Sequence, residues 1–194
     1  MPVLMKWYRH GVYHKLNKII EPHFGAFFTP KMKKISYCIL VLLVYSCQQK
    51  ATQPEIQKTV TDYYETYQKR DDFNKFLEFY DQNMVLEDVI YGERIIGKKQ
   101  FAEFFDWNHP NFKLLDTVAM VIQNQVIDDN QAVTQGYFTP FQWDTIKVAP
   151  MKFTTILTFN TEGKIIKHVD WINYPSNLID YQNRKDSNSW INSK

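Results

Sequence analysis

Four side chains are of the types from which general acid–base chemistry is built. His168 and Asp170 stand two apart in a largely apolar run, so on a strand both would point to the same face. Asp88 ends a shorter apolar run, and Tyr64 lies upstream in a helix-like pattern. An apolar wall raises the pKa of a carboxyl group, and a neighbouring histidine holds that group or relays its proton. Together these residues would suit proton transfer on a carbonyl compound.

Each of these residues also has a structural explanation. His168 and Asp170 would pair simply to satisfy polar groups on a partly buried strand, which we rank somewhat above a catalytic dyad. Asp88 would lie in a solvated turn at the end of its strand. Tyr64 would belong to an aromatic core stripe, the commoner role of such a residue on a helix. The residue types alone leave both roles open.

Two further aromatic residues, Tyr91 and Trp143, are candidates to line a pocket for a flat apolar ligand. Trp171, which follows Asp170, should face away from His168 because strand side chains alternate.

Metal and cofactor chemistry have little support in the sequence. A centre built from Asp88, His168 and Asp170 would hold one histidine, a poor match to the two-histidine facial triad. The sequence also has no glycine-rich phosphate loop, nucleophile elbow or HExxH motif. We therefore expect neither a metal ion nor an organic cofactor.

Charge is unevenly distributed along the 194 residues. Residues 1–47 hold seven Lys or Arg and one Glu, a net charge of +6, whereas the remainder holds 16 basic and 20 acidic residues, a net charge of −4. A mildly acidic body argues against nucleic acid as a partner. The length and a 44% hydrophobic content fit one domain with one core.

The basic excess belongs to a predicted targeting segment. Two lysines precede the mostly apolar stretch 35–46, which as a helix would span roughly 18 Å, short of the roughly 30 Å membrane core. The segment ends in Val44-Tyr-Ser-Cys47, which resembles the lipobox of bacterial lipoproteins. We expect a signal peptide over 32–46, a lipidated Cys47 and a polar tether to residue 53.

This assignment places the domain in the periplasm, anchored to a membrane of the bacterial envelope. The rival interpretation is an uncleaved anchor with an incidental cysteine. If residues 32–46 are a signal peptide, residues 1–31 would be upstream read-through with Met32 as the initiator; the rival interpretation of residues 1–31 is a basic aromatic arm on a membrane surface.

Helix signals dominate the first half of the remaining chain. Thr52 and Glu55 match a capping box. The apolar spacing that follows predicts a helix with Ile56, Val60, Tyr63 and Tyr67 on one face. Asp72 can cap a second helix bearing Phe73, Phe76, Leu77 and Tyr80, and a third carries Phe101, Phe104 and Phe105.

Strand signals dominate the second half. A short strand is predicted over 84–88 and four longer ones over 112–125, 131–141, 151–160 and 164–172, joined by turns. Short links favour an antiparallel meander with helices on one face, an α+β architecture. The predicted domain covers 54–182, with one helical turn over 177–181 and a frayed polar tail over 183–194.

The order of these elements resembles the cone-shaped domains of the nuclear transport factor 2 superfamily, which includes ketosteroid isomerases and SnoaL-like polyketide cyclases. The spacing Tyr64-x15-Tyr80-x7-Asp88-x8-Gly97 is similar to that of the isomerases, from a helix tyrosine to the general-base aspartate and a following glycine. Residues 159–173, FNTEGKIIKHVDWIN, resemble the last hairpin of SnoaL-like members.

The resemblance implies a cone whose interior receives Tyr64, Asp88, His168 and Asp170, and it implies a homodimer. Thr155 stands where the isomerases carry a second, protonated aspartate, so steroid isomerisation is not expected, and Thr155 becomes a ligand-binding candidate. Two hypotheses follow. We favour an envelope protein that binds a small, largely apolar molecule. The alternative is a cofactor-independent isomerase or cyclase using Asp88 or Asp170 as general acid or base.

Overall fold

The computed structural model describes residues 51–192. The predicted read-through segment 1–31, the signal peptide 32–46 and the lipidation site Cys47 lie outside these described residues.

Three helices precede most of the strands: α2 (Gln53–Lys69), α3 (Phe73–Glu78) and α4 (Lys98–Phe105). The capping box of α2 is confirmed, since the Thr52 backbone N–H donates to the Glu55 carboxylate (2.6 Å). The helix ends where Arg70 adopts a left-handed conformation (φ 51°). Asp72 caps α3 as expected, by accepting from the backbone N–H of Lys75 (2.9 Å). Tyr80, placed on that helix by its spacing, instead begins the first strand.

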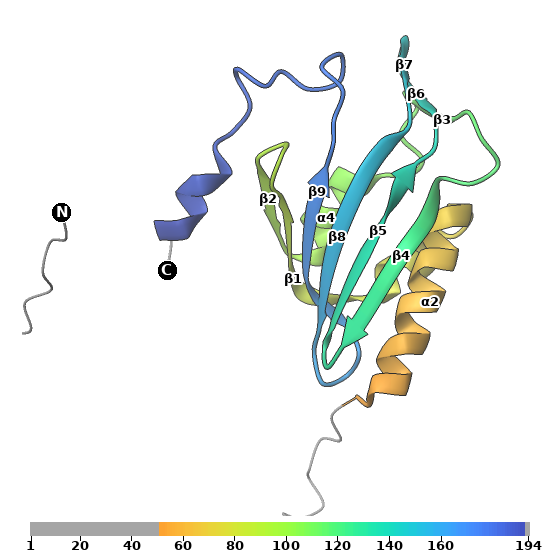
Figure 1. Cartoon of the computed structure of the whole chain (residues 1–194), viewed down its shortest axis with the longest axis vertical. Helices are drawn as coiled ribbons and strands as arrows, with labels where there is room; N and C mark the ends of the chain where they lie inside the picture. Colours follow the sequence, from red (N-terminus) through yellow and green to blue (C-terminus); the bar gives the residue numbers. More distant parts are fainter. Residues whose placement is uncertain (1–50, 193–194) are drawn as a thin grey trace, which may run out of the picture. The chain divides into compact units, whose positions relative to one another are not determined.

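The main sheet has six strands in the spatial order β2-β1-β9-β8-β5-β4 (Figure 1). Their bounds are β1 Tyr80–Asp88, β2 Glu93–Ile96, β4 Met120–Asp128, β5 Gln131–Phe138, β8 Met151–Phe159 and β9 Ile165–Ile172. The strands β4, β5, β8 and β9 form the expected antiparallel meander. The α+β class predicted from the sequence is confirmed.

One strand pair differs from the expected topology. The last strand, β9, lies between β8 and β1 and runs parallel to β1, so the sheet is mixed. The parallel pairing sets Asp88 directly opposite Asp170.

Two of the predicted long strands are each broken in two. The predicted 112–125 divides into β3 (Phe112–Leu114) and β4, and the predicted 131–141 divides at Pro140, beyond which lies β6 (Phe141–Trp143). Proline has no N–H to continue a ladder, and the Asp116 side chain accepts from the Thr117 backbone N–H in a local turn. The pieces pair with β7 (Ile146–Val148) in a separate sheet of order β3-β6-β7.

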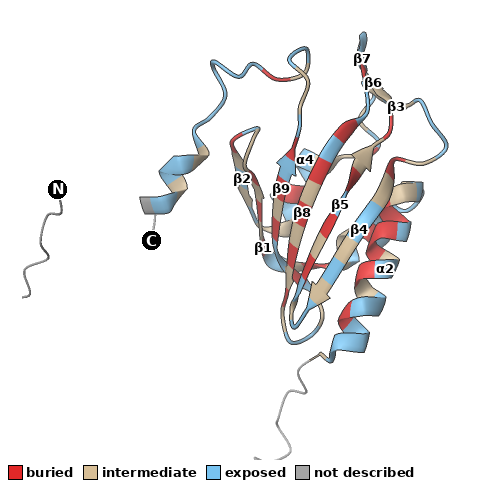
Figure 2. Ribbon diagram, in the orientation of Figure 1, coloured by how far each residue is buried: buried red, intermediate tan, exposed pale blue. Residues whose placement is uncertain are grey.

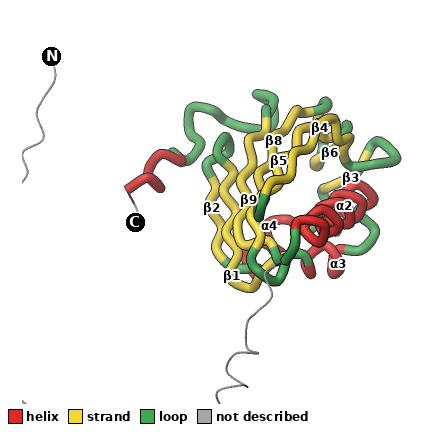
Figure 3. The backbone as a smooth tube through the Cα atoms, turned by 60° about the horizontal axis from the view of Figure 1, so that its bottom comes forward, coloured by secondary structure: helices red, strands yellow, loops and turns green. Residues whose placement is uncertain are grey.

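The three helices lie on one side of the curved main sheet, and an aromatic core fills the space between the two layers (Figure 3). Tyr63, Phe76, Tyr80 and Phe101 are among its fully buried side chains. Their rings contact one another, as in the pair Tyr80–Phe101 with centroids 4.3 Å apart. Buried and exposed residues alternate along the strands, so one face of the sheet is interior (Figure 2).

The chain beyond β9 forms a strap, residues 173–192, across the β1–β2 turn. Lys185 forms an ion pair with Glu93 (2.5 Å), and the Ser187 hydroxyl donates to the Val89 carbonyl (3.1 Å). Gly92 (φ +79°) permits a close approach, because a Cβ there would lie 2.1 Å from the Lys185 carbonyl oxygen.

Two expectations for this strap were wrong. Residues 176–178 form a turn in place of the helical turn predicted over 177–181, and Ser187–Asn192 is a 3₁₀ helix within the predicted frayed tail.

Within residues 51–192, every helix is too short or too polar to cross a bilayer.

Candidate functional site

A row of polar side chains crosses the interior face of the main sheet. Pairing register places Asp88 beside Asp170, then Thr155, Thr134 and Gln125, one residue on each of five successive strands. The Thr155 hydroxyl donates to Asp170 Oδ1 (2.5 Å), and the Gln125 amide donates to the Thr134 hydroxyl (3.1 Å). Side-chain hydrogen bonds therefore join two of the four neighbouring pairs in this row.

Asp88 is a buried carboxyl group, only 3% exposed, at the end of β1. Its Oδ1 accepts from the Tyr91 backbone N–H (2.8 Å), and its Oδ2 accepts from the Tyr174 hydroxyl. Burial is the largest effect on its pKa and raises it to about 6, helped by the charge of Asp170 and opposed by these hydrogen bonds. A carboxyl group of this kind takes up and releases a proton close to neutral pH.

His168 connects Asp170 to a chain of buried tyrosines. Its Nδ1 lies 3.0 Å from the Tyr80 hydroxyl, which lies 2.9 Å from the Tyr63 hydroxyl. On its other side, Nε2 lies 3.1 Å from Asp170 Oδ1, although the two are not aligned as a hydrogen bond. Burial raises the pKa of Tyr63 and Tyr80 well above the usual value, so both phenols stay protonated. The chain can therefore orient the imidazole toward Asp170.

The Tyr64 hydroxyl is an unpartnered donor in this interior, as is the Trp107 indole N–H elsewhere in the core. The Tyr64 hydroxyl is fully buried, and no aligned hydrogen bond satisfies it among the described residues. Burial is the dominant effect on the pKa of Tyr64 and raises it, while the nearby hydroxyls of Thr134 and Thr155 act in the opposite direction. A buried donor of this kind is well placed to donate to an oxygen atom that enters from outside.

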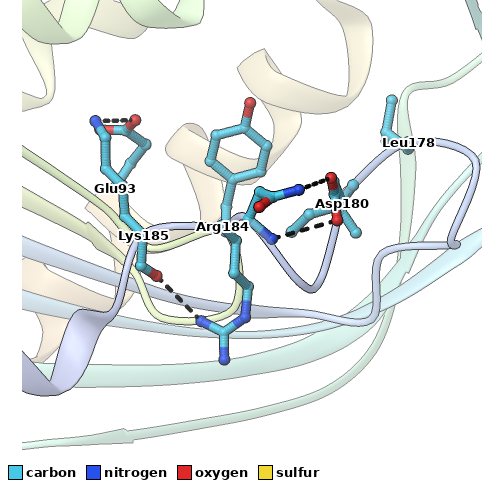
Figure 4. Close-up of a pocket in the computed structure, with 8 residues that line it drawn as sticks. Glu93, Leu178, Asp180, Arg184 and Lys185 are labelled. Atoms are coloured by element: carbon cyan, nitrogen blue, oxygen red, sulfur yellow. Dashed lines mark hydrogen bonds and ion pairs between the residues drawn. The ribbon is translucent and has the colours of Figure 1, made fainter.

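A hollow of about 260 Å³ lies between the β1–β2 turn and the strap (Figure 4). Its lining residues are Tyr91, Glu93, Leu178, Ile179, Asp180, Asn183, Arg184 and Lys185. The Tyr91 and Tyr174 rings are in contact, with centroids 5.8 Å apart. Tyr174, whose hydroxyl donates to Asp88 Oδ2, thus links this carboxyl group to Tyr91, a lining residue of the hollow.

The structure brings most of the sequence-predicted residues together. Asp88, Asp170, His168 and Thr155 lie on the interior face of the sheet, and Tyr64 faces them from α2. The expectation that Asp88 would lie in a solvated turn was wrong. Trp171 faces the opposite side of the sheet from His168, as alternation predicted.

Two predicted pocket residues lie elsewhere. Tyr91 lines the hollow between the β1–β2 turn and the strap. Trp143 lies in the small sheet, where its ring stacks on His109 with centroids 4.7 Å apart.

Sequence reasoning missed Tyr174. The signal for it is the period of two that runs from His168 through Asp170 and Ile172 to Tyr174, which continues the interior face beyond the end of β9. It also missed the link from Tyr80 to His168, because no spacing in the sequence shows that these two residues meet.

Among residues 51–192, no cluster of three or more His, Cys, Asp or Glu side chains has the arrangement of a metal site.

Comparison with known proteins identifies relatives of the fold. The family model of the SnoaL-like domain matches residues 60–168. A protein assigned to the SnoaL-like polyketide cyclases, from Shewanella denitrificans OS-217, superposes with a TM-score of 0.52 at 16% identity, over 73% of this chain and 99% of that one. No curated protein matches the sequence.

Two other solved structures show the same likeness. One, from Shewanella putrefaciens CN-32 and assigned to the same cyclases, gives a TM-score of 0.52 at 16% identity, over 62% of this chain and 90% of that one. The other, an LEH-like epoxide hydrolase from M. tuberculosis, gives a TM-score of 0.50 at 16% identity, over 62% and 84%. The cone-shaped fold expected from the sequence is thereby confirmed.

The raised pKa of Asp88 predicts a pH-dependent stability. The folded protein keeps the Asp88 proton at pH values where the unfolded chain has lost it, so the free energy of unfolding should fall as the pH rises from about 4 to about 6. The contribution is about 3 kcal/mol. Urea unfolding at pH 4, 5, 6 and 7 measures it as the difference between wild type and Asp88→Asn. Parallel pH profiles for the two proteins would contradict the prediction.

Proposed function

This chain belongs to the SnoaL-like family of the nuclear transport factor 2-like superfamily, and on that basis we propose that it binds a small, largely apolar molecule carrying one carbonyl or hydroxyl group. The observation that carries this proposal is the buried, unpartnered Tyr64 hydroxyl facing a row of polar groups in an aromatic interior. The aromatic side chains suit the apolar part of the ligand, and Tyr64 donates to its oxygen.

We infer that such a ligand enters past Tyr174. Its hydroxyl holds Asp88 Oδ2, and the Tyr181 hydroxyl in turn donates to the Tyr174 carbonyl. The strap thus places its own donor on Asp88, and a ligand hydroxyl group, though not a ketone oxygen, can take the place of that donor.

We expect 2-tetralone, an apolar bicyclic ketone, to bind the wild-type protein, and Tyr64→Phe to weaken binding about fivefold because one hydrogen bond is lost. Tyr174→Phe removes the hydrogen bond that holds Tyr174 at Asp88 and should tighten binding, because moving the ring then costs less free energy. Isothermal titration calorimetry measures the dissociation constants. The matched control is Tyr137→Phe, on a half-buried tyrosine of the opposite sheet face. Equal affinities of Tyr64→Phe and wild type would refute the proposal.

A second candidate function is cofactor-independent catalysis, favoured by the carboxyl group of Asp88 with its pKa of about 6. In this scheme Asp88 takes a proton from the carbon next to the carbonyl group. The C–H electron pair forms a carbon–carbon double bond as the carbonyl π pair moves to the oxygen, and Tyr64 donates a hydrogen bond to the resulting enolate. Return of a proton to carbon completes an isomerase-type step. Asp170 is the alternative acid or base.

Catalysis of this kind should exchange the α-protons of 2-tetralone in D₂O faster than buffer does. Asp88→Asn should lower the protein-catalysed rate by about 100-fold or more, because a neutral amide cannot take the proton. Proton NMR follows the loss of the α-CH signal. Exchange no faster than in buffer, while the ketone still binds, would leave binding as the function and dismiss the catalytic scheme.

We further propose that the protein is a lipoprotein of the bacterial envelope, anchored through Cys47 with its domain in the periplasm. The support is the sequence of residues 32–47, in which two lysines, a short apolar stretch and a lipobox-like end follow one another. Several acyl chains on Cys47 would give stable anchoring.

Metabolic labelling of a bacterial expression host with a radiolabelled fatty acid should mark the wild-type protein and spare Cys47→Ser. The label should fractionate with membranes. An intact mass that begins at residue 1 would contradict both the Met32 start and the cleavage before Cys47.

A further inference from the structure

A second hollow, of about 300 Å³, lies on the outer face of the main sheet. It is lined by Gln123, Gln135, Gly136, Lys152, Phe153, Thr154, Trp171 and Asn173. Gln135, Thr154 and Trp171 are register partners across β5, β8 and β9. Each is the chain neighbour of a residue in the interior polar row, so it points to the opposite side of the sheet. This hollow is therefore separate from the Asp88 site.

A local irregularity of the strands shapes the hollow. The register between β4 and β5 shifts between Ile122 and Asn124, which leaves Gln123 as the extra residue of a bulge. Such bulges twist a strand and re-aim a side chain. Gly136 stands opposite Ile122, and a Cβ there would lie 2.2 Å from the Val121 carbonyl oxygen, so this part of the lining stays bare backbone.

The side chains around the hollow have spare hydrogen-bonding capacity. Among the described residues, those of Gln123, Lys152 and Asn173 make no hydrogen bond or ion pair, and Gln135 makes only a long one to Thr154 (3.5 Å). Amide side chains both donate and accept, and the ammonium group only donates. Beside them the Trp171 indole is 49% exposed, a large apolar ring held on a rigid strand.

We propose that this hollow is a binding site for a pyranose ring of a carbohydrate. A pyranose has an apolar C–H face that packs on an indole and a rim of hydroxyl groups that need both donors and acceptors. Trp171 supplies the first, and Gln123, Gln135 and Asn173 supply the second. A purely apolar ligand would leave these amides unpaired, which is unfavourable. The lining contains no carboxylate to repel an acidic sugar.

Placement on strands strengthens this assignment. Four neighbouring strands hold all the lining residues except Asn173, which directly follows β9, so the indole and the two glutamine amides keep fixed separations that a site on loops would not ensure. A volume of about 300 Å³ is at the lower end of the range for ligand pockets, roughly 300 to 1,000 Å³, and suits one sugar ring with its neighbours in solvent.

The test is a titration of the full-length protein with chitotriose, cellotriose and maltotriose. Binding is followed by ¹H–¹⁵N NMR at the Trp171 indole N–H. At least one sugar should give a saturable shift. Trp171→Ala should weaken binding by about tenfold or more, with Trp171→Phe in between. Gln123→Ala and Gln135→Ala should each weaken it several-fold.

Two variants serve as matched controls. Gln131→Ala alters an exposed glutamine at the far end of β5, and Phe104→Ala removes an exposed aromatic ring from α4. Both should bind sugar as the wild type does. Tyr64→Phe should also retain sugar binding, which separates this site from the interior one whatever the outcome of the ketone titration.

The proposal fails if none of the three sugars shifts the Trp171 signal at millimolar concentration. It also fails if Trp171→Ala leaves the affinity unchanged. Sedimentation velocity identifies the competing explanation. If wild type is a dimer, Trp171→Ala is a monomer and no sugar binds, the hollow belongs to an interface between two copies of the chain.

Discussion

The structure depends on satisfying two carboxyl groups that the parallel pairing of β1 and β9 brings side by side in an aromatic interior. Removing a carboxylate from water is unfavourable unless donors surround it. The neighbouring groups follow from this need: Thr155 donates to Asp170, Tyr174 and the Tyr91 N–H donate to Asp88, and the tyrosine chain orients His168. Asp88 avoids a buried negative charge by holding its proton up to about pH 6. The same hydrogen bonds that make the buried carboxyl groups tolerable in the core leave Asp88 ready to exchange a proton near neutral pH.

Local chemistry made much of the fold predictable. The capping box at Thr52, the cap at Asp72 and the aromatic stripe of α2 are all properties of neighbouring residues, and all three are present. The errors came where one residue interrupts a run of strand formers. Pro140 and the turn at Asp116 each break an apolar run that periodicity treats as continuous. Short connections between strands predict antiparallel neighbours such as β8 and β9. They do not show that β9 also pairs in parallel with β1, which depends on where β1 lies at the edge of the sheet.

The candidate site was predictable in part for the same reason. Alternation placed His168 and Asp170 on one face and Trp171 on the other, since these relations lie within one strand. The partners of these residues required the register between strands and the path of the chain after β9. Tyr80 meets His168 across 88 positions of sequence, and Tyr174 meets Asp88 across 86. Contacts between residues so far apart in the sequence depend on how the whole domain packs, so no local sequence pattern indicates them.

The strap gives the interior a kinetic property. Tyr174, near its start, is held by its hydrogen bond to Asp88 and its contact with Tyr91. Residues 183–192 are held on the β1–β2 turn by fewer contacts: one ion pair at Lys185, the Ser187 hydrogen bond and the close approach that Gly92 permits. Segments held by so few interactions open by local unfolding at a small fraction of the global stability. If the interior binds a ligand as proposed, that ligand meets a binding-competent form that is only part of the population, and its apparent affinity is reduced by that fraction. Association would be limited by how often the strap lifts, so residues far from the ligand would set how fast it arrives.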